Sequence, residues 1–383
     1  MDIIENKTSF VEKEVLMLAG RENNSRRSYV VVNRLQAKHV PVSPEKTVQL
    51  FNQLGELIKE AYPNETILMI GFAETATAIG AYVAEVLGGQ SYYLHTTREE
   101  IKEVQKLVEF CEEHSHATEQ ILYCKNWPQI KEQIDRIVFV EDEVTTGKTI
   151  LNFVKALKDD GLIDSSMKLA VASVVNGMDE TSIERFRSQG IEWHYLLKLR
   201  TEHIEEQLLK IDQAEVDEVY DEWDLPTFEI KKISGKTNPR VGVPVTAYVE
   251  KCDLLADQII QAIGKPHLAG KKVLVMGTEE FMYPAIKAAE KMLKECEVHS
   301  IRTHSTTRSP ILPFDHKDYP LKSRYALTSF YSDTRQTYIY NLAQYDYAVI
   351  LTDANESTSG FGELCKALAH KGCDTIMLIK WVE

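Results

Sequence analysis

The chain has 383 residues, of which 44% are hydrophobic and 27% are charged, and its formal net charge is −14. A length well above that of one ordinary core predicts two domains, and the acidic balance argues against general binding to nucleic acid or anionic membranes. No apolar run approaches the roughly 20 residues that span a bilayer, and the N-terminus lacks a signal-peptide core, so we expect a cytoplasmic protein.

Helices and strands alternate through the first half of the sequence. Apolar residues recur at helical spacing between residues 43 and 62, which indicates an amphipathic helix. Strands are predicted at 67–70, 91–94, 137–140 and 169–175, and helices at 75–87 and 149–158. This alternation favours an α/β fold with a parallel sheet flanked by helices.

An acidic segment follows these elements. Residues 201–225 are rich in Glu and Asp, and their apolar residues recur at helical spacing. We interpret the segment as a solvated helical connector and place the domain boundary near Pro226. The predicted domains are therefore residues 1–225 and 226–383.

One stretch of the first domain indicates a ligand. The strand at 137–140 runs into Glu141 and Asp142, and then into Thr145-Thr146-Gly147-Lys148-Thr149, which opens a helix. The unpaired N–H groups and positive dipole of a helix start, together with threonine hydroxyls, form a seat for phosphate. Adjacent acids at the carboxyl end of a parallel strand are suited to bind the vicinal hydroxyls of a sugar. The pattern predicts a ribose 5-phosphate site.

Two other interpretations of this stretch are open to the same residues. The first is an ordinary strand-to-helix turn with a solvated acidic rim. In the ligand-site interpretation Glu143 has a secondary role, in which it adds a metal contact or faces solvent. A P-loop is the second, but the glycine that should precede Gly147 by five positions is Asp142. The sequence therefore argues against a nucleotide triphosphatase.

Residues 140–149 resemble the phosphoribosyl pyrophosphate (PRPP) signature of type I phosphoribosyltransferases, which has two acids, two variable positions and then Thr-Thr-Gly-x-Thr. Nearly the whole chain resembles the two-domain proteins of tellurite-resistance-type stress operons, which join a phosphoribosyltransferase domain to a TRSP domain. The segments that carry this wider resemblance are Asn24-Ser25-Arg26-Arg27, Lys38-His39-Val40-Pro41, His95-Thr96-Thr97-Arg98-Glu99, Glu113-His114-Ser115-His116-Ala117 and Thr307-Arg308-Ser309-Pro310.

The resemblance implies a type I phosphoribosyltransferase fold followed by a second, diverged domain of the same kind. It implies that Glu141 and Asp142 bind the ribose hydroxyls, directly or through Mg²⁺ carried by PRPP, which makes them the predicted catalytic and metal-contacting residues. Arg98 is the third predicted catalytic residue, because the loop at 71–75, where the family cradles pyrophosphate, has no Lys or Arg. A surface arginine paired with a neighbouring glutamate is the alternative. Further predicted PRPP contacts are Gly71, Phe72, Ala73, Glu74, Thr75, Thr97, Val144, Thr145, Thr146, Gly147, Lys148 and Thr149.

Basic residues outside the signature complete the predicted site. His114 and His116 fall where type I enzymes carry a mobile loop over PRPP, so we expect them to contact pyrophosphate; an exposed loop is the alternative. Arg26, Arg27, Lys38 and His39 precede the first long helix, where a hood holds the acceptor in this family. We expect them to line the acceptor pocket or reach the diphosphate, with an ordinary basic surface as the alternative.

The second half repeats the plan of the first at offsets of 206 to 214 residues. The matched segments are Asn24-Ser25-Arg26 with Asn238-Pro239-Arg240, 67–71 with 273–277, 95–98 with 303–308, and 138–142 with 349–353. Ordered matches of this kind favour a duplication, in which the TRSP half is a diverged copy of the first.

The copy has lost parts of the signature. Thr352 stands opposite Glu141, and the glycine in register with Gly147 is missing, so a complete PRPP site is not expected there. Small polar residues at a helix start still predict a second anion site. The family resemblance adds the Thr-Arg-Ser-Pro turn, for which a loop capped by Pro310 is the alternative, to this site. Its residues are Thr307, Arg308, Ser309, Asp353, Ser357, Thr358, Ser359 and Gly360.

The predicted function is transfer of ribose 5-phosphate from PRPP, with Mg²⁺, to a nitrogenous acceptor resembling a nucleobase, with release of pyrophosphate. The operon resemblance implies a nucleoside-like stress metabolite as product, a homodimer, and other enzymes of the same operon as partners. Two alternatives from other classes are a PRPP- or nucleotide-sensing regulator without turnover, and a scaffold for a biosynthetic complex.

Overall fold

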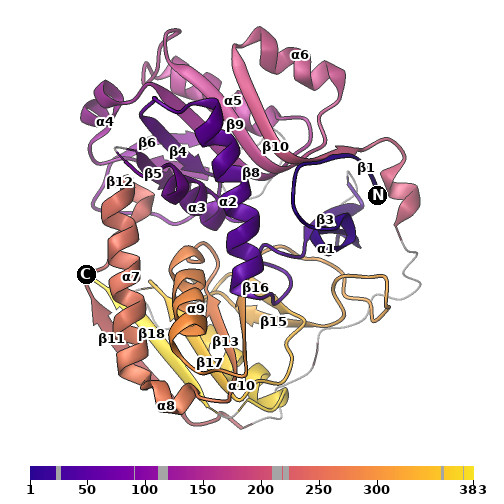
Figure 1. Cartoon of the computed structure of the whole chain (residues 1–383), viewed down its shortest axis with the longest axis vertical. Helices are drawn as coiled ribbons and strands as arrows, with labels where there is room; N and C mark the ends of the chain where they lie inside the picture. Colours follow the sequence, from indigo (N-terminus) through magenta and orange to yellow (C-terminus); the bar gives the residue numbers. More distant parts are fainter. Residues whose placement is uncertain are drawn as a thin grey trace.

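In a computed structural model, the protein is described over residues 1–22, 27–89, 91–110, 120–208, 218, 224–354, 358–373 and 375–383. The first half, joined by the strand β12 from the second, builds a seven-stranded sheet in the order β1-β10-β9-β8-β4-β5-β12 (Figure 1). Its strands are β1 (Asp2–Asn6), β4 (Ile67–Gly71), β5 (Tyr92–His95), β8 (Arg136–Val144), β9 (Lys168–Asn176), β10 (Ile191–Arg200) and β12 (Val243–Pro244). The five inner strands are parallel, and the two outermost strands pair antiparallel with their neighbours.

Helices cover both faces of this sheet. One face carries α2 (Pro44–Ala61) and α3 (Thr77–Leu87), and the other carries α4 (Trp127–Gln133), α5 (Lys148–Asp159) and α6 (Glu180–Ser188). The remaining elements are the short helix α1 (Glu12–Val15) and two hairpins, β2 (Leu16–Gly20) with β3 (Tyr29–Asn33), and β6 (Lys106–Phe110) with β7 (Gln120–Tyr123). The predicted elements are thus present, with ends that shift by a few residues.

The second half is a smaller unit with a five-stranded parallel sheet in the order β11-β18-β17-β13-β14. Its strands are β11 (Phe228–Ser234), β13 (Lys272–Gly277), β14 (Ser300–Ser305), β17 (Tyr347–Thr352) and β18 (Ile376–Val382). Helices α7 (Val245–Ile263), α8 (Lys265–Leu268), α9 (Tyr283–Glu295) and α10 (Gly360–His370) and the hairpin of β15 (Arg324–Thr328) and β16 (Gln336–Tyr340) complete it. The predicted α/β class is confirmed in both halves.

The topology repeats between the two halves. Apart from the short helix α4 between β7 and β8, the run β4-α3-β5-β6-β7-β8-α5-β9 has the same order as β13-α9-β14-β15-β16-β17-α10-β18. The sheet order repeats as well, since β9-β8-β4-β5 corresponds to β18-β17-β13-β14. The architecture therefore supports the duplication that the sequence matches indicate.

The connector and the domain boundary are only partly described. Residues 201–208 contain a single 3₁₀ turn, Ile204–Gln207, and most of the rest of the predicted connector lies outside the described residues. Beyond it, β11 joins the second sheet, whereas β12 belongs to the first. None of the helices in the described ranges is both long and apolar enough to cross a membrane.

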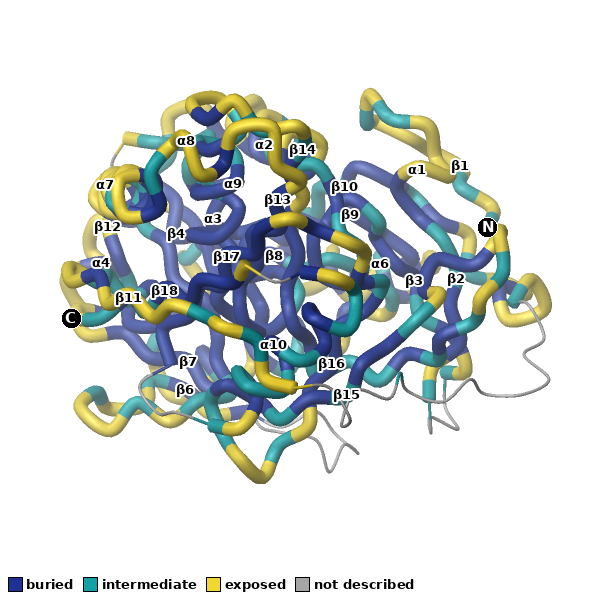
Figure 2. The backbone as a smooth tube through the Cα atoms, turned by 90° about the horizontal axis from the view of Figure 1, so that it is seen from below, coloured by how far each residue is buried: buried dark blue, intermediate teal, exposed yellow. Residues whose placement is uncertain are grey.

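A shared helix layer joins the two halves. Helix α2 runs between the two sheets, and α3 packs beside α9 and α7 (Figure 1). Helix α2 begins with Pro44 at its first position, which suits a helix start, and buries Leu50, Phe51, Leu54 and Ile58 completely. The central strands of both sheets are likewise buried (Figure 2). The apolar residues of this layer form one continuous core.

Aromatic rings fill the centre of the layer. The Tyr82 and Tyr283 rings meet edge to face at 4.8 Å, and the Tyr248 ring stacks on Tyr283 at 5.3 Å and on Tyr93 at 6.0 Å. Two of these three contacts, Tyr82 with Tyr283 and Tyr93 with Tyr248, join the halves, so each half supplies part of the other's core.

We predict that a chain ending at residue 236 is poorly folded, because it exposes the apolar faces of α2 and α3 that the second half covers. Size-exclusion chromatography and binding of a hydrophobic dye measure this, with the full chain as control. A monomeric fragment that melts as cooperatively as the full chain would contradict it.

Candidate functional site

The predicted phosphate seat forms where β8 ends. The strand continues through Val144, beyond the predicted 137–140, so the three acids at 141–143 lie within it. Thr145 and Thr146 make the turn, and α5 begins at Lys148. The Lys148 N–H donates to Thr146 Oγ1 over 3.4 Å, and the start of the helix provides the amides and dipole that an anion needs.

Gly147 is required at this turn for two physical reasons. Its φ of +65° lies in the left-handed region, where side chains are disfavoured. A Cβ at this position would also lie 2.1 Å from Cε2 of Phe186, a fully buried ring of α6. Both the backbone conformation at Gly147 and its contact with Phe186 therefore favour a residue without a side chain.

Asp142 is the acid most closely tied to the surrounding loops. The Thr75 hydroxyl donates to its carboxylate, and the Glu143 N–H donates to Asp142 Oδ1 over 2.9 Å. Withdrawal from water nevertheless raises the pKa of Asp142 above its usual value, because desolvation outweighs these hydrogen bonds. Thr75 and Asp142, both predicted PRPP contacts, are thus brought together.

Arg27 and Glu143 form a second charged group beside this acid. The Arg27 guanidinium donates from Nη2 to both Glu143 oxygens, at 2.7 and 2.9 Å, and lies 4.2 Å from the Tyr29 ring centroid. Burial raises the pKa of Glu143 despite this pairing. Arg27, in the Asn-Ser-Arg-Arg segment, was among the residues that the sequence predicted to line the acceptor pocket or reach the diphosphate.

A cavity of about 570 Å³ opens next to the phosphate seat. Its walls come from the seat, from β3 and the residues before it, from the loop between β9 and α6, and from the segment after β10. They are Arg27, Tyr29, Thr145, Thr146, Gly177, Asp179, Ser182, Thr201, His203, Ile204, Glu205 and Glu206. Thr145 and Thr146 were predicted from sequence, whereas the segments after β9 and β10 carry no motif that would have shown them.

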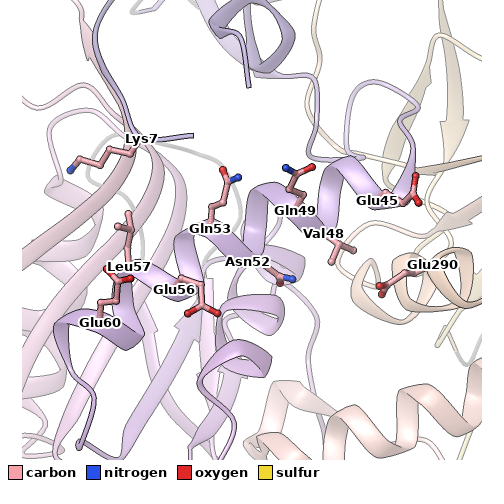
Figure 3. Close-up of a pocket in the computed structure, with 10 residues that line it drawn as sticks. All are labelled: Lys7, Glu45, Val48, Gln49, Asn52, Gln53, Glu56, Leu57, Glu60 and Glu290. Carbon is pink, nitrogen blue, oxygen red and sulfur yellow. The ribbon is translucent and has the colours of Figure 1, made fainter. Parts of the chain in front are cut away.

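A second cavity, of about 520 Å³, lies along the outer side of α2 (Figure 3). Its lining residues are Lys7, Glu45, Val48, Gln49, Asn52, Gln53, Glu56, Leu57, Glu60 and Glu290. Gln49 and Gln53 donate to Ser9 Oγ there. None of the predicted site residues lines this cavity, so we place the candidate site at the phosphate seat.

The loop expected to cradle pyrophosphate is braced largely by protein contacts. Phe72 is fully buried against the Phe153 ring at 5.2 Å, so its side chain belongs to the core and not to a ligand. The Ala73 N–H donates to Thr96 Oγ1 over 2.8 Å. Glu74 is buried and points to the second half. Gly71 is held tightly too, because a Cβ there would lie 2.8 Å from the Ala76 carbonyl oxygen.

Lys38 and His39 do not line the cavity beside the phosphate seat, contrary to the sequence expectation. The fully buried Lys38 ammonium pairs with Glu74 and donates to the carbonyls of Glu279 and Thr306, at 2.7 and 3.0 Å. His39 lies edge-on to Tyr340, and burial lowers its pKa to about 3. Both side chains are therefore part of the interface between the halves, because the chain turns inward before α2.

Of the remaining predicted contacts, Thr97 and Arg98 bind a glutamate of the second half, and others lie outside the described residues. The Thr97 hydroxyl donates to Glu280 Oε2 over 2.7 Å, and the Arg98 N–H donates to Glu280 Oε1 over 2.9 Å. Arg98 Nε is buried with no hydrogen-bond partner among the described residues. Arg26, His114, His116 and Ser357 lie outside the described residues.

Several residues of the predicted second anion site bind protein groups. Arg308 Nε donates to Glu279 over 2.5 Å, and the same guanidinium pairs with Glu99, so protein carboxylates occupy it. Asp353 is buried; although desolvation opposes this, Arg240 and then Lys236 lower its pKa to about 2. Thr307 Oγ1 accepts the Ser309 N–H, and Gly360, the first residue of α10, packs against the Thr328 carbonyl. Thr358 Oγ1 is buried without a hydrogen-bond partner among the described residues.

Comparisons with known families identify both halves. A family model described as phosphoribosyl transferase matches residues 15–200, and one described as the TRSP domain, C-terminal to such a transferase, matches residues 239–368. The first half is a phosphoribosyltransferase domain. The second is a TRSP domain, and the predicted enzyme class, phosphoribosyltransferase, is confirmed.

Solved structures are similar to about half of the chain. An adenine phosphoribosyl transferase from Trypanosoma brucei is 15% identical over 49% of this chain and 76% of its own, with a TM-score of 0.34. An orotate phosphoribosyltransferase from Aeropyrum pernix is 16% identical over 51% and 94%, with a TM-score of 0.32. An adenine phosphoribosyltransferase from Rhodothermus marinus is 14% identical over 49% and 96%, with a TM-score of 0.33. No curated protein matches the chain.

Gly147→Ala is predicted to destabilise the phosphoribosyltransferase domain by about 2–3 kcal/mol, because the methyl group combines a strained φ with overlap on Phe186. Urea unfolding measures the change. Gly161→Ala is the matched control, since φ is +68° there and nothing lies within 4 Å of the place that the methyl group would take, so about 1 kcal/mol is expected. Equal losses at both positions would show that the packing on Phe186 is unimportant.

Asp142→Asn is predicted to stabilise the ligand-free protein at pH 8 by up to about 1 kcal/mol, because it removes a carboxylate that burial disfavours. A raised folded-state pKa means that the wild-type acid costs stability as pH rises through that pKa. The gain should therefore fade as pH falls towards about 4, the usual pKa of an aspartate. Thermal melts across this range measure it.

Asp179→Asn is the opposite control for this effect. Asp179 caps α6 by accepting the Ser182 N–H at 2.8 Å, and this contact lowers its pKa. Asp179→Asn should therefore lower stability at pH 8. A destabilising effect of Asp142→Asn at pH 8 would contradict the prediction.

Proposed function

We propose that the protein transfers ribose 5-phosphate from PRPP to a nitrogenous, nucleobase-like acceptor and releases pyrophosphate. The observation that carries the proposal is the cavity at the end of β8, where the Thr145-Thr146-Gly147 turn opens α5 beside the Thr75–Asp142 contact. The helix start suits the 5-phosphate, and Asp142 with Glu141 suits the ribose hydroxyls. Binding energy at the phosphate end then orients C1 of the sugar for attack.

The carboxylate pair also fits the magnesium ion that PRPP would bring. Such an ion usually takes one or two protein carboxylates and completes its shell with substrate phosphates and water. Correspondingly, the described residues contain no group of three or more His, Cys, Asp or Glu side chains that could hold a metal by themselves. When bound, Mg²⁺ would neutralise charge that develops on the departing diphosphate.

The acceptor would enter from the side of the β2–β3 hairpin, which serves as the hood in this proposal. Tyr29, on β3, and Arg27, just before it, line the cavity. The hairpin is fixed by the TRSP domain, because the Leu312 N–H donates to the Gly20 carbonyl and the Gly20 N–H donates to the Tyr319 hydroxyl, at 2.9 and 2.7 Å. We therefore propose that the TRSP domain shapes the acceptor pocket. The operon resemblance adds the proposal that the acceptor belongs to a nucleoside-like stress metabolite.

Release of pyrophosphate from PRPP and Mg²⁺ in the presence of candidate bases tests this function. The wild-type protein should turn over with at least one nitrogenous acceptor, and Asp142→Asn should lose at least about 100-fold, because it removes the charged acid at the ribose. Gln49→Ala, in the α2 cavity away from the site, is the control that should retain activity. PRPP binding without turnover on any base would favour a sensor instead, and absence of PRPP binding would overturn the proposal.

A further inference from the structure

Two matching loops meet across the interface between the domains. In the phosphoribosyltransferase domain the Ala73 N–H donates to Thr96 Oγ1 over 2.8 Å, and in the TRSP domain the Glu279 N–H donates to Thr306 Oγ1 over 3.0 Å. In both domains, the loop after the first core strand is therefore braced by the turn after the second. The duplicated fold places these two braced loops face to face.

Each loop then extends one glutamate to the turn of the other domain. Glu280 of the TRSP domain accepts the Arg98 N–H over 2.9 Å. Glu74 of the phosphoribosyltransferase domain accepts the Arg308 N–H, with both oxygens at 3.4 Å. The two contacts are reciprocal, since Glu74 and Glu280 occupy equivalent places after β4 and β13. The arginine of the Thr-Arg-Ser-Pro segment is thus the counterpart of Arg98.

The Arg308 side chain strengthens this contact inside a buried charge cluster. Its Nε lies 2.5 Å from Glu279 and 3.7 Å from Glu74, and its Nη2 pairs with Glu99, which Arg335 also contacts at 2.6 Å. The side chains of Arg308, Glu74 and Glu279 are 8%, 6% and 0% exposed, so water cannot replace a missing partner. Loss of Arg308 would leave two buried glutamates close together.

The cluster is directly continuous with the proposed PRPP site. Glu74 is followed by Thr75, whose hydroxyl donates to Asp142. Movement of Glu74 would therefore displace Thr75 and its contact with Asp142. We propose that Arg308 is a positioning residue: through Glu74 it holds the loop at 72–75 in the conformation that binds PRPP, an inference that rests on the proposed function. The TRSP domain thereby acts as a built-in partner subunit of the transferase domain.

Isothermal titration with PRPP and Mg²⁺, without acceptor, tests the inference. Arg308→Met should weaken PRPP binding roughly 10- to 100-fold, the effect of misplacing a binding loop by about 1 Å. Arg308→Lys should recover part of the affinity, because it restores a positive charge but not the planar fork. In turnover assays, KM for PRPP should rise more than kcat falls, and KM for the acceptor should change little.

Lys287→Met provides the matched control. Lys287, on α9, also crosses the interface, donating to Glu85 at 2.9 Å and pairing with Asp253 at 3.2 Å, and its side chain is 10% exposed. Its loss removes ion pairs of the same interface away from the loop, although their acidic partners Glu85 and Asp253 are more exposed, at 26% and 47%. It should leave PRPP affinity within about twofold. An equal loss in Lys287→Met and Arg308→Met would overturn the inference in favour of general loosening of the interface.

The remaining outcomes separate the inference from the function on which it rests. If the wild type does not bind PRPP, the proposed function fails. If the wild type binds and Arg308→Met binds equally well, the inference alone is overturned. If circular dichroism shows that Arg308→Met is unfolded, Glu74→Gln tests the same contact from the other side; weaker PRPP binding supports the inference, and unchanged binding overturns it.

Discussion

The burial of Lys38, Glu74, Glu279 and Arg308 between the two domains is the constraint on which the rest of the structure depends. Four charges are removed from water at one place, which is tolerable only when every partner is present and well oriented. The carbonyls of Glu279 and Thr306 complete the surroundings of Lys38. The loops that carry these residues are consequently fixed, and so is the relative position of the two sheets.

This constraint explains why the two halves differ chemically although they share a topology. The first keeps Asp142, Thr145 and Gly147 at the end of its central strand, next to an open cavity. In the second, at the equivalent end of β17, Asp353 pairs with Arg240 and Tyr331, and all three line a smaller cavity of about 380 Å³. Asp142, which we propose binds the ribose, thus corresponds to Asp353, which forms an ion pair with Arg240. In our proposal, the first half carries the chemistry and the second supports it.

The sequence was most informative where a local pattern determines a local structure. The strand before Glu141, the Thr-Thr-Gly turn and the repeat at 67–71 and 273–277 could be read directly, because the alternation of strands and helices depends on neighbouring residues. The ion pairs of Lys38 and Arg308 could not be predicted, since their partners lie far away in the chain and a buried ion pair leaves no periodic signal. For the same reason the cavity walls after β9 and β10, such as Asp179 and Thr201, were missed.

The short strand β12 has a consequence for the chain as a whole. Val243 and Pro244 lie at the start of the TRSP domain yet pair antiparallel with β5 at the edge of the transferase sheet. Proline has no N–H to offer, so the outermost strand cannot extend the ladder there to a further strand from another molecule. Because the chain runs directly from β12 into α7, unfolding of α7 would also disturb the edge of the first sheet. The two domains should accordingly unfold in one cooperative transition. Neither domain could then be exchanged for another in evolution without changes in the domain that it contacts.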